Sequence, residues 1–389
     1  MINNLGISQT LKINQKCKEL SKNKKVFNCG FGQSPFDPPD ILKRQICNNI
    51  DSCGYSNVQG ILELRQSIKK HYSKYHNVSI DEDNILIGPG SKELLCLLNL
   101  CLKNHIYIIA PYWVSYYNQV KIFNIDHSII HTKFEDKWKI TCDQVNSLLD
   151  NSFLILNSPN NPTGQIYSRD ELKQITDICR EKNITIIADE IYQYLAFDET
   201  QTHTLLEIYP EQTIITNGLS KWCHCGGYRL GYMIFPEKLG KLKSDVICCA
   251  SETFSCVNTP LQLGTIKLFE NFGDIIDINK ENIKVLKKIS SYLYYEFINL
   301  NIKVHKSEGA FYFFLDFTNY ESILKKNNIH NSVKLVENLL DETGIAILPG
   351  SAFGIIGLTA RYAFTNVDMI ENKIIISKIT EWIKKLQSG

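Results

Sequence analysis

Residues 213–235 read TIITNGLSKWCHCGGYRLGYMIF and carry the clearest fold signal in the chain. The stretch begins with the β-branched run TIITN and ends with the apolar run LGYMIF. Runs that are apolar nearly throughout are typical of strands covered on both faces. We therefore expect two buried strands here, joined by a loop that contains a lysine, a Cys-His-Cys sequence and an arginine.

Runs of the same kind recur between residues 84 and 235, and helix-like stretches separate them. This alternation favours a mostly parallel α/β sheet flanked by helices. In such sheets, ligands bind in loops beyond the carboxyl ends of the strands. We expect four such loops, GPGSKELL, NSPNNPTG, DEIY and GLSK, to form one active site. The predicted strands are NILI, IYIIA, HSIIH, FLILN, ITIIAD, TIITN and LGYMIF.

The pattern changes after about residue 285. Residues 283–300 read as a helix, and the strand-like sequence GAFYFFLDF follows them. We expect a smaller α+β domain there, to which the N-terminal segment also contributes. The predicted division is a large domain at 45–285 and a small domain built from both chain ends, 1–44 and 286–389.

Composition narrows the class of partner. The formal net charge of +1 gives no general reason to bind nucleic acid or an anionic membrane. The longest apolar run, 94–102, is far shorter than the roughly 20 residues that a membrane span needs. The 13 cysteines are odd in number and scattered, which does not suit a disulfide framework. We expect a cytoplasmic protein that binds neither nucleic acid nor a membrane.

The loop after TIITN offers two readings. Cys223, His224 and Cys225 are residue types that bind metals, but no second ligand pair follows at zinc-finger spacing, so we expect no metal site. Lys221 follows a predicted buried strand, where desolvation can lower the pKa of an ammonium group and make the amine a Schiff-base nucleophile. The alternative for a lysine taken alone is a solvated surface side chain.

Other loops offer groups for a ligand. Asp189 ends ITIIAD, where a carboxylate in apolar surroundings needs a cationic partner such as a protonated pyridine nitrogen, although a helix cap is an alternative. GPGSKELL presents backbone N–H groups before a helix, which favours a phosphate or a simple capped turn. Only six of the 42 basic residues are arginines, which favours anion-binding roles for Arg229 and Arg361.

These pieces, in this order, resemble the class I/II aminotransferases, which are pyridoxal-phosphate enzymes of fold type I. The resemblance spans nearly the whole chain, and the combination of SPNNPTG, DEIY and Ser-Lys followed by G-x-R-x-G is very specific. It implies that Lys221 forms the internal aldimine and later moves a proton between substrate and cofactor. Asp189 resembles the partner of the pyridinium nitrogen. Asn161 and Tyr192 resemble donors to the ring hydroxyl oxygen, and Trp113 resembles the aromatic that stacks on the ring.

The resemblance also implies the phosphate and substrate contacts. Tyr55 resembles a tyrosine that reaches the phosphate from the other subunit, which implies a homodimer with shared active sites. Arg361 and Asn161, with the backbone of Gly32, resemble the groups that bind the substrate α-carboxylate. The remaining phosphate contacts implied by the resemblance are Gly90, Ser91, Lys92, Ser220 and Arg229.

The implied cofactor is pyridoxal 5'-phosphate, and the implied reaction moves an α-amino group between an amino acid and a 2-oxo acid by ping-pong kinetics. One alternative is another carbanion reaction on the same cofactor, such as β/γ-elimination, carbon–sulfur cleavage or cyclisation. A second is a cofactor-binding module without catalysis, against which the intact set of site residues argues. Lys92 stands where some members use a lysine near an acidic substrate's distal carboxylate, which makes aspartate or glutamate a candidate donor.

The chain departs from its family beside the reactive lysine. Cys223 occupies a position where an aromatic residue is usual, and Cys225 one where an aliphatic residue or methionine is usual. These differences touch the surroundings of the cofactor and leave its anchoring residues unchanged.

Overall fold

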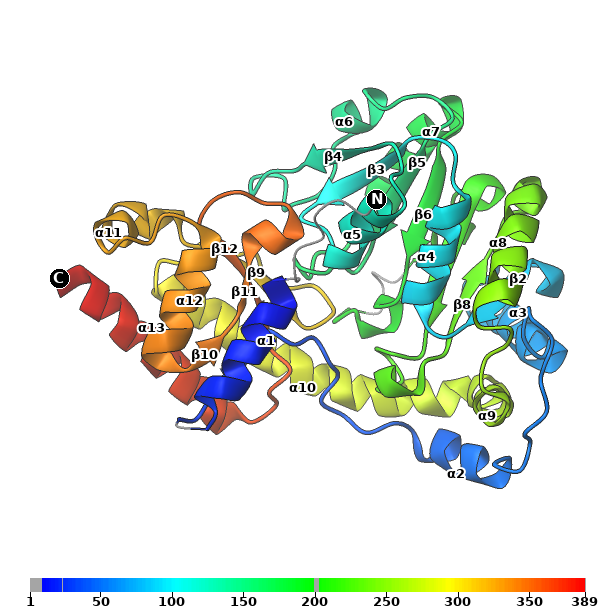
Figure 1. The fold of residues 1–389 in the computed structure, drawn as a ribbon, viewed down its shortest axis with the longest axis horizontal. Helices are drawn as coiled ribbons and strands as arrows, with labels where there is room; N and C mark the ends of the chain where they lie inside the picture. Colours follow the sequence, from blue (N-terminus) through cyan, green and yellow to red (C-terminus); the bar gives the residue numbers. More distant parts are fainter. Residues whose placement is uncertain (1–8, 23, 199–202, 389) are drawn as a thin grey trace.

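The computed structural model describes residues 9–22, 24–198 and 203–388. Within these residues, the main sheet has seven strands in the order β2-β8-β7-β6-β5-β3-β4 (Figure 1). Only β8 runs antiparallel to its neighbours β7 and β2. The predicted runs are thus confirmed as strands of one mostly parallel sheet. Their bounds are β2 Ile85–Gly88, β3 Ile106–Ala110, β4 His127–His131, β5 Phe153–Asn157, β6 Thr185–Asp189, β7 Thr213–Gly218 and β8 Gly231–Ile234.

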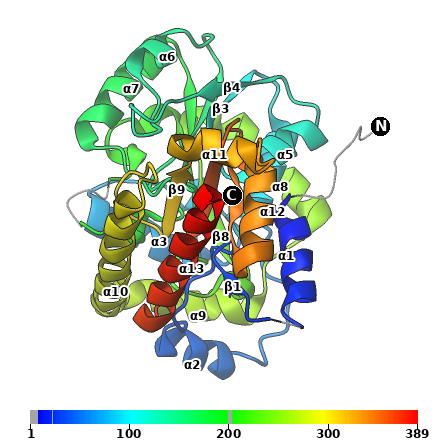
Figure 2. The ribbon, with the colours of Figure 1, turned by 90° about the vertical axis from the view of Figure 1, so that its left-hand side faces the viewer.

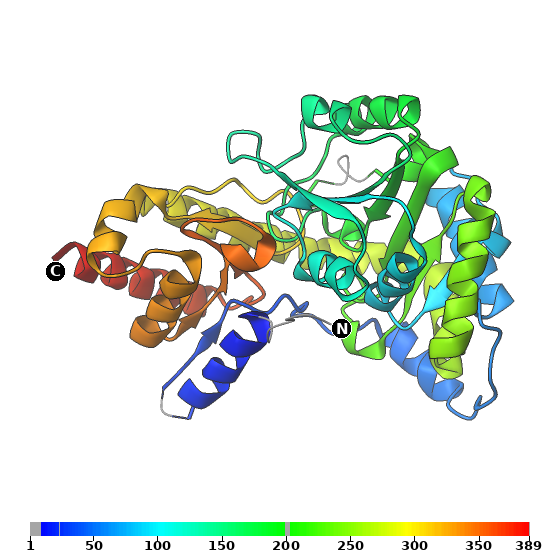
Figure 3. The same cartoon turned by 45° about the horizontal axis from the view of Figure 1, so that its top comes forward.

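Helices cover both faces of this sheet (Figure 3). On one face α4 packs against α5 and α8, and on the other α6 packs against α7. Both faces being covered explains why the strands are apolar along their whole length. The bounds are α2 Asp40–Asn48, α3 Leu62–His76, α4 Ser91–Cys101, α5 Val114–Ile122, α6 Cys142–Asn146, α7 Arg169–Glu181, α8 Gly240–Thr253 and α9 Thr259–Glu270.

A smaller antiparallel sheet, β11-β12-β9, lies beside the main one and is packed with helices from the end of the chain (Figures 1 and 2). The N-terminal segment joins this part, because β1 pairs in parallel with β10 and α1 contacts β11. The bounds are α1 Gln9–Leu20, β1 Phe27–Asn28, α10 Phe272–Asn299, β9 Tyr312–Asp316, α11 Glu321–Lys326, α12 Ser332–Thr343, β10 Ile345–Ala346, β11 Leu348–Pro349, β12 Thr359–Ala363 and α13 Met369–Ser388.

The long helix α10 extends from the main sheet's helices to the smaller sheet (Figure 1). It begins at Phe272, well before the helix predicted at 283–300, because buried side chains such as Ile275 and Leu286 continue its inner face across the whole length. The predicted boundary at 285/286 therefore falls inside one helix. The division into 45–285 and the two end segments remains a prediction.

Local sequence signals fix several of these elements. Ser168 begins α7 with a capping box, in which its side chain accepts from the backbone of Glu171 and the Glu171 side chain accepts in return. Gly344 ends α12 in the left-handed conformation, at φ 77°. No described helix has the length and the apolar character that crossing a bilayer requires.

Candidate active site

The carboxyl edge of the main sheet brings the predicted loops together. Asn157 at the end of β5 is in register with Asp189 at the end of β6, which is in register with Thr216 of β7. The Asn157 side chain reinforces this by donating from Nδ2 to the Asp189 carbonyl at 2.8 Å. The loops that contain Asn161, Tyr192 and Lys221 therefore start side by side, as the alternation of strands and helices predicted.

Asp189 is a buried carboxylate with only 3% of its surface exposed. Its Oδ2 accepts from Tyr116 Oη at 2.5 Å, and its Oδ1 accepts from the backbone N–H of Ile191 at 3.3 Å. Burial raises the pKa of Asp189 to about 6, although these hydrogen bonds and the charge of Lys221 oppose the rise. Among the described residues Asp189 forms no ion pair, so its surroundings suit a cationic ring nitrogen.

Lys221 follows β7 and points toward the N-terminal segment. Its Nζ donates to the Gly32 carbonyl at 2.7 Å and lies 5.4 Å from the ring centre of Tyr192 and 5.6 Å from that of Phe311. Burial of the ammonium group lowers the pKa of Lys221 to about 8, and the positive charge of Arg361 lowers it further than Asp189 raises it. Near neutral pH a useful fraction of this amine is uncharged and nucleophilic.

The start of α4 and the lysine loop form an anion cradle. Gly90, at φ 92°, allows Arg229 to approach so closely that a Cβ at Gly90 would lie 2.3 Å from Arg229 Nη2. Arg229 donates to the carbonyl oxygens of Pro89 at 3.0 Å and Gly226 at 2.9 Å. The N–H groups that open α4, at Ser91 and Lys92, have no partner within the helix. This arrangement fits a phosphate.

Two more predicted phosphate residues have different surroundings. Ser220 lies in the turn between β7 and Lys221 and next to Gly226, whose carbonyl accepts from Arg229. Tyr55 is 93% exposed, so the structure does not bring it into the site of its own chain.

Arg361 of β12 supplies a buried guanidinium group, 5% exposed, beside the same site. Its Nη1 donates to Asn161 Oδ1 at 3.0 Å and its Nη2 to the Gly30 carbonyl at 2.6 Å. Its centre lies 4.6 Å from the ring of Tyr312, whose hydroxyl is 2.8 Å from that of Tyr192. Arg361 Nε is buried and has no partner among the described residues. The group is well suited to a carboxylate.

Trp113 and Lys92 lie together at the edge of the cradle. Lys92 Nζ is 5.0 Å from the centre of the Trp113 ring, and Trp113 packs edge-on against Tyr116 at 5.4 Å. Burial of the ammonium group, followed by the charge of Arg229, lowers the pKa of Lys92. Trp113 is thereby next to the tyrosine that contacts Asp189.

Cys223, His224 and Cys225 have protein partners. The ring nitrogens of His224 bond to Ser34 Oγ at 2.7 Å and Asn282 Nδ2 at 3.1 Å. Cys225 Sγ lies 3.3 Å from the Leu219 carbonyl. Both cysteines are buried, so they fill the turn between the lysine and Arg229.

Sequence reasoning missed several residues of the site. Tyr116 lies three residues after Trp113, and helical spacing could have placed both on one face. Tyr312 and Phe311 come from β9 and its approach, where no local pattern indicates a contact with Tyr192 or Lys221.

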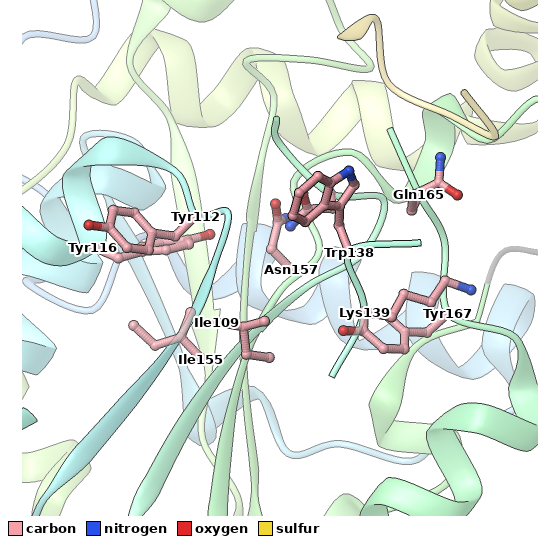
Figure 4. A pocket seen from close by; sticks show the side chains of 10 residues that line it. Ile109, Tyr112, Tyr116, Trp138, Lys139, Ile155, Asn157, Gln165 and Tyr167 are labelled. Atoms are coloured by element: carbon pink, nitrogen blue, oxygen red, sulfur yellow. The ribbon is translucent and has the colours of Figure 1, made fainter. Parts of the chain in front are cut away.

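A small cavity of about 10 Å³ lies next to the Tyr116 side chain (Figure 4). Tyr116 and Asn157, which both bond to Asp189, line it together with Trp138 and Gln165. The volume suits about one water molecule. The cavity is therefore too small to hold an amino acid.

Known proteins share this sequence and this architecture. The sequence profile of the family Aminotransferase class I and II matches residues 24–379. The chain belongs to that family. A protein of Aquifex aeolicus named probable aspartate/prephenate aminotransferase is 30% identical, with 98% of each chain covered. A protein of the same name from Rickettsia typhi is 31% identical, with 92% of each covered. The crystal structure of the aspartate aminotransferase of Thermotoga maritima aligns with a TM-score of 0.87 at 26% identity, covering 98% of each chain.

The chain is accordingly a pyridoxal-phosphate-dependent aminotransferase acting on an amino acid and a 2-oxo acid. The named relatives are aminotransferases, and none of them is a lyase or a cyclase. When bound, pyridoxal phosphate supplies an electron sink for charge that develops at the substrate Cα. The cradle at Gly90 and Arg229, together with the unpaired carboxylate of Asp189, fits its phosphate and its ring nitrogen.

Proposed function

We propose that Lys221 binds the cofactor covalently and then moves the proton between substrate and cofactor. The observation that carries this proposal is the position of its Nζ, 2.7 Å from the Gly32 carbonyl, with a pKa near 8. Asp189 holds a proton at the ring nitrogen through its buried carboxylate. Tyr192 and Asn161 orient the ring oxygen, and Trp113 stacks on the ring.

The same proposal assigns the anion-binding groups. Arg361, held by Asn161 and Gly30, binds the substrate α-carboxylate with help from the backbone at Gly32. Its buried fork is preorganised, because two carbonyl-type oxygens already fix its plane. The proposed phosphate contacts are Tyr55 from the other subunit, Gly90, Ser91, Lys92, Ser220 and Arg229.

The amino donor in this proposal is acidic, of the aspartate or glutamate type. Lys92 supports it, because its ammonium group lies at the edge of the site over Trp113. The names of the Aquifex and Thermotoga relatives, which contain aspartate, agree with this donor class. A distal carboxylate next to Lys92 would form a charge-assisted contact that an apolar donor lacks.

The test is a donor series of aspartate, glutamate, alanine and an aromatic amino acid, each with a keto-acid acceptor. We expect an acidic donor to give the highest kcat/KM. Lys92→Ser should lower kcat/KM for acidic donors by about tenfold and change that for alanine little. Lys103→Ser, just beyond the other end of α4, is the matched control. An equal loss for acidic and apolar donors would contradict the assignment of Lys92.

The proposed assembly is a homodimer with shared sites, in the cytoplasm. The 93% exposure of Tyr55 supports a role toward a second subunit. A mixed dimer of Lys221→Ala and Tyr55→Asp subunits tests it, because one of its two sites would then contain both intact residues. Recovered activity on mixing two inactive variants is expected. No recovery would place Tyr55 in its own subunit's site, and normal activity of Tyr55→Asp alone would place it outside both sites. Cell fractionation tests the compartment.

A further inference from the structure

His224 joins three separate parts of the chain around the reactive lysine. Its Nδ1 lies 2.7 Å from Ser34 Oγ in the N-terminal segment, and its Nε2 lies 3.1 Å from Asn282 Nδ2 on α10. Its backbone N–H donates to the Lys221 carbonyl at 3.3 Å. The residue adopts φ 57°, in the left-handed region, which is uncommon for residues other than Gly although His, Asn and Asp are enriched there. The conformation that aims this ring is held by its contacts.

The hydrogen bonds define the state of the ring. Because Asn282 Nδ2 donates to Nε2, the proton of a neutral ring is on Nδ1, which donates to Ser34 Oγ. Phe36 packs edge-on against the same ring at 5.3 Å. Burial lowers the pKa of His224 to about 4, so one neutral tautomer satisfies both partners across the neutral range. Ser34 itself is buried.

The N-terminal segment at 30–34 is held at every second residue. The Gly30 carbonyl accepts from Arg361 at 2.6 Å, and the Gly32 carbonyl accepts from Lys221 at 2.7 Å. The third bond is that of Ser34 to His224. The first two donors are groups that a substrate carboxylate and the cofactor would engage. Of these three bonds, only the third is free of ligand chemistry. The segment has one further and longer side-chain bond, from Thr365 Oγ1 to the Phe31 carbonyl at 3.4 Å.

We propose that His224 is a positioning residue that anchors segment 30–34 through Ser34 and Asn282. The anchor keeps Gly30 and Gly32 beside Arg361 and Lys221 even when those two side chains turn to their ligands. It thereby preserves the backbone that helps to bind the substrate carboxylate. This inference rests on the proposed roles of Arg361, Lys221 and Gly32.

The test uses the two partners of the ring, because Ala at position 224 would itself be strained at φ 57°. In Ser34→Ala and Asn282→Ala we expect KM for the amino donor to rise about 3- to 10-fold, with kcat within twofold. In the cofactor-loaded protein, where Lys221 is engaged by its ligand, hydrogen exchange of the backbone amides at 30–34 and 36 should quicken by a similar factor. Asn279→Ala is the matched control, since it removes an α10 side-chain bond to the Tyr194 carbonyl and does not touch the segment.

A double variant separates anchoring from general stability. Asn tolerates the left-handed region, so His224→Asn keeps the backbone while shortening the side chain. Ser34→Ala should then add little to His224→Asn, in both KM and amide exchange. Additive effects would overturn the proposal, and so would partner variants that, as expected of Asn279→Ala, lower only the unfolding temperature. The exchange measurement needs no turnover, so it tests the anchor even if the assigned role of Lys221 were wrong.

Discussion

The two sides of the active site are built in different ways. On the side of the main sheet, Asp189 and Lys221 follow neighbouring parallel strands, and backbone pairing sets their distance. On the other side, Gly30 and Arg361 come from opposite ends of the chain and meet through a bond from the Arg361 side chain to the Gly30 carbonyl. The Gly32 carbonyl accepts from Lys221 across the site. Backbone ladders are exchanged only on unfolding, whereas these side-chain bonds can be exchanged for a ligand. The first side is therefore a fixed platform, and the second is suited to rearrange when substrate binds.

The largest effect is expected on the fixed side. Lys221→Ala removes both the nucleophile and the proton carrier, so turnover should fall by at least about a thousandfold. Steady-state assays with the best donor measure the loss. Lys241→Ala, an exposed lysine of α8 paired with Asp245, should keep normal turnover. If Lys221→Ala still made multiple turnovers at more than a few per cent of the normal rate, Lys221 would not be the essential group of the fixed side.

The substrate side should respond in KM more than in kcat. Arg361→Lys keeps the charge but loses the planar fork that contacts Asn161 and Gly30, so KM for the donor should rise about 10- to 100-fold. Arg180→Lys, an exposed arginine on α7, is the control for the same chemical change. An unchanged KM in Arg361→Lys would mean that the carboxylate binds elsewhere.

The buried charge of Asp189 should cost the apoprotein stability in a defined pH range. Burial raises the pKa of Asp189 from 3.8 to about 6, so the folded state holds this proton more tightly than the unfolded state does. Stability therefore falls as pH rises from about 4 to 6, by about 3 kcal/mol at most. The free energy of unfolding of Asp189→Asn, relative to that of the wild type, should therefore increase from about pH 4 to 6 and stay constant at higher pH.

Urea unfolding of both apoproteins at several pH values measures this difference. The offset at pH 4 reports the altered hydrogen bonds to Tyr116 and Ile191, and its growth toward pH 7 reports the charge. Glu190, whose pKa burial raises to about 8, is present in both proteins. If the difference in the free energy of unfolding did not vary with pH, the pKa of Asp189 would not be raised in the folded apoprotein.

The smallest effect concerns the contact between the two sides. Tyr312→Phe removes the hydroxyl that meets Tyr192 at 2.8 Å, and one neutral hydrogen bond corresponds to a 2- to 10-fold loss in kcat/KM. Tyr320→Phe, which removes a bond to the Leu300 carbonyl away from the site, is the control. A loss as large as that of Arg361→Lys would indicate that Tyr312 itself contacts the substrate.

The sequence predicted the main-sheet side of the active site better than the side formed by the chain ends. The strands that end at Asp189 or precede Asn161 and Lys221 are apolar runs, and parallel topology brings their ends to one edge. The meeting of these loops could therefore be predicted by position, whereas Asn161 itself was assigned through the resemblance. Arg361 was assigned through its motif and the scarcity of arginine, and its bond to Asn161 needed the structure. Tyr312 and the Ser34–His224–Asn282 contacts join segments far apart in the chain, where periodicity gives no signal.

The helix predicted at 283–300 was too short, and tertiary packing explains why. The local pattern placed its start at residue 283, but α10 begins at Phe272 because buried side chains such as Ile275 continue its inner face toward the N-terminus. Packing against the rest of the protein, rather than local sequence pattern, therefore sets where α10 begins.

Borohydride reduction of the cofactor-loaded protein, followed by peptide mass spectrometry, tests the central claim most directly. Reduction makes the bond between a lysine and pyridoxal phosphate permanent, so the modified peptide identifies the lysine. We predict a single modified site at Lys221 and none in Lys221→Ala. Modification of Lys92 or another lysine, with Lys221 unmodified, would contradict the assignment of the site.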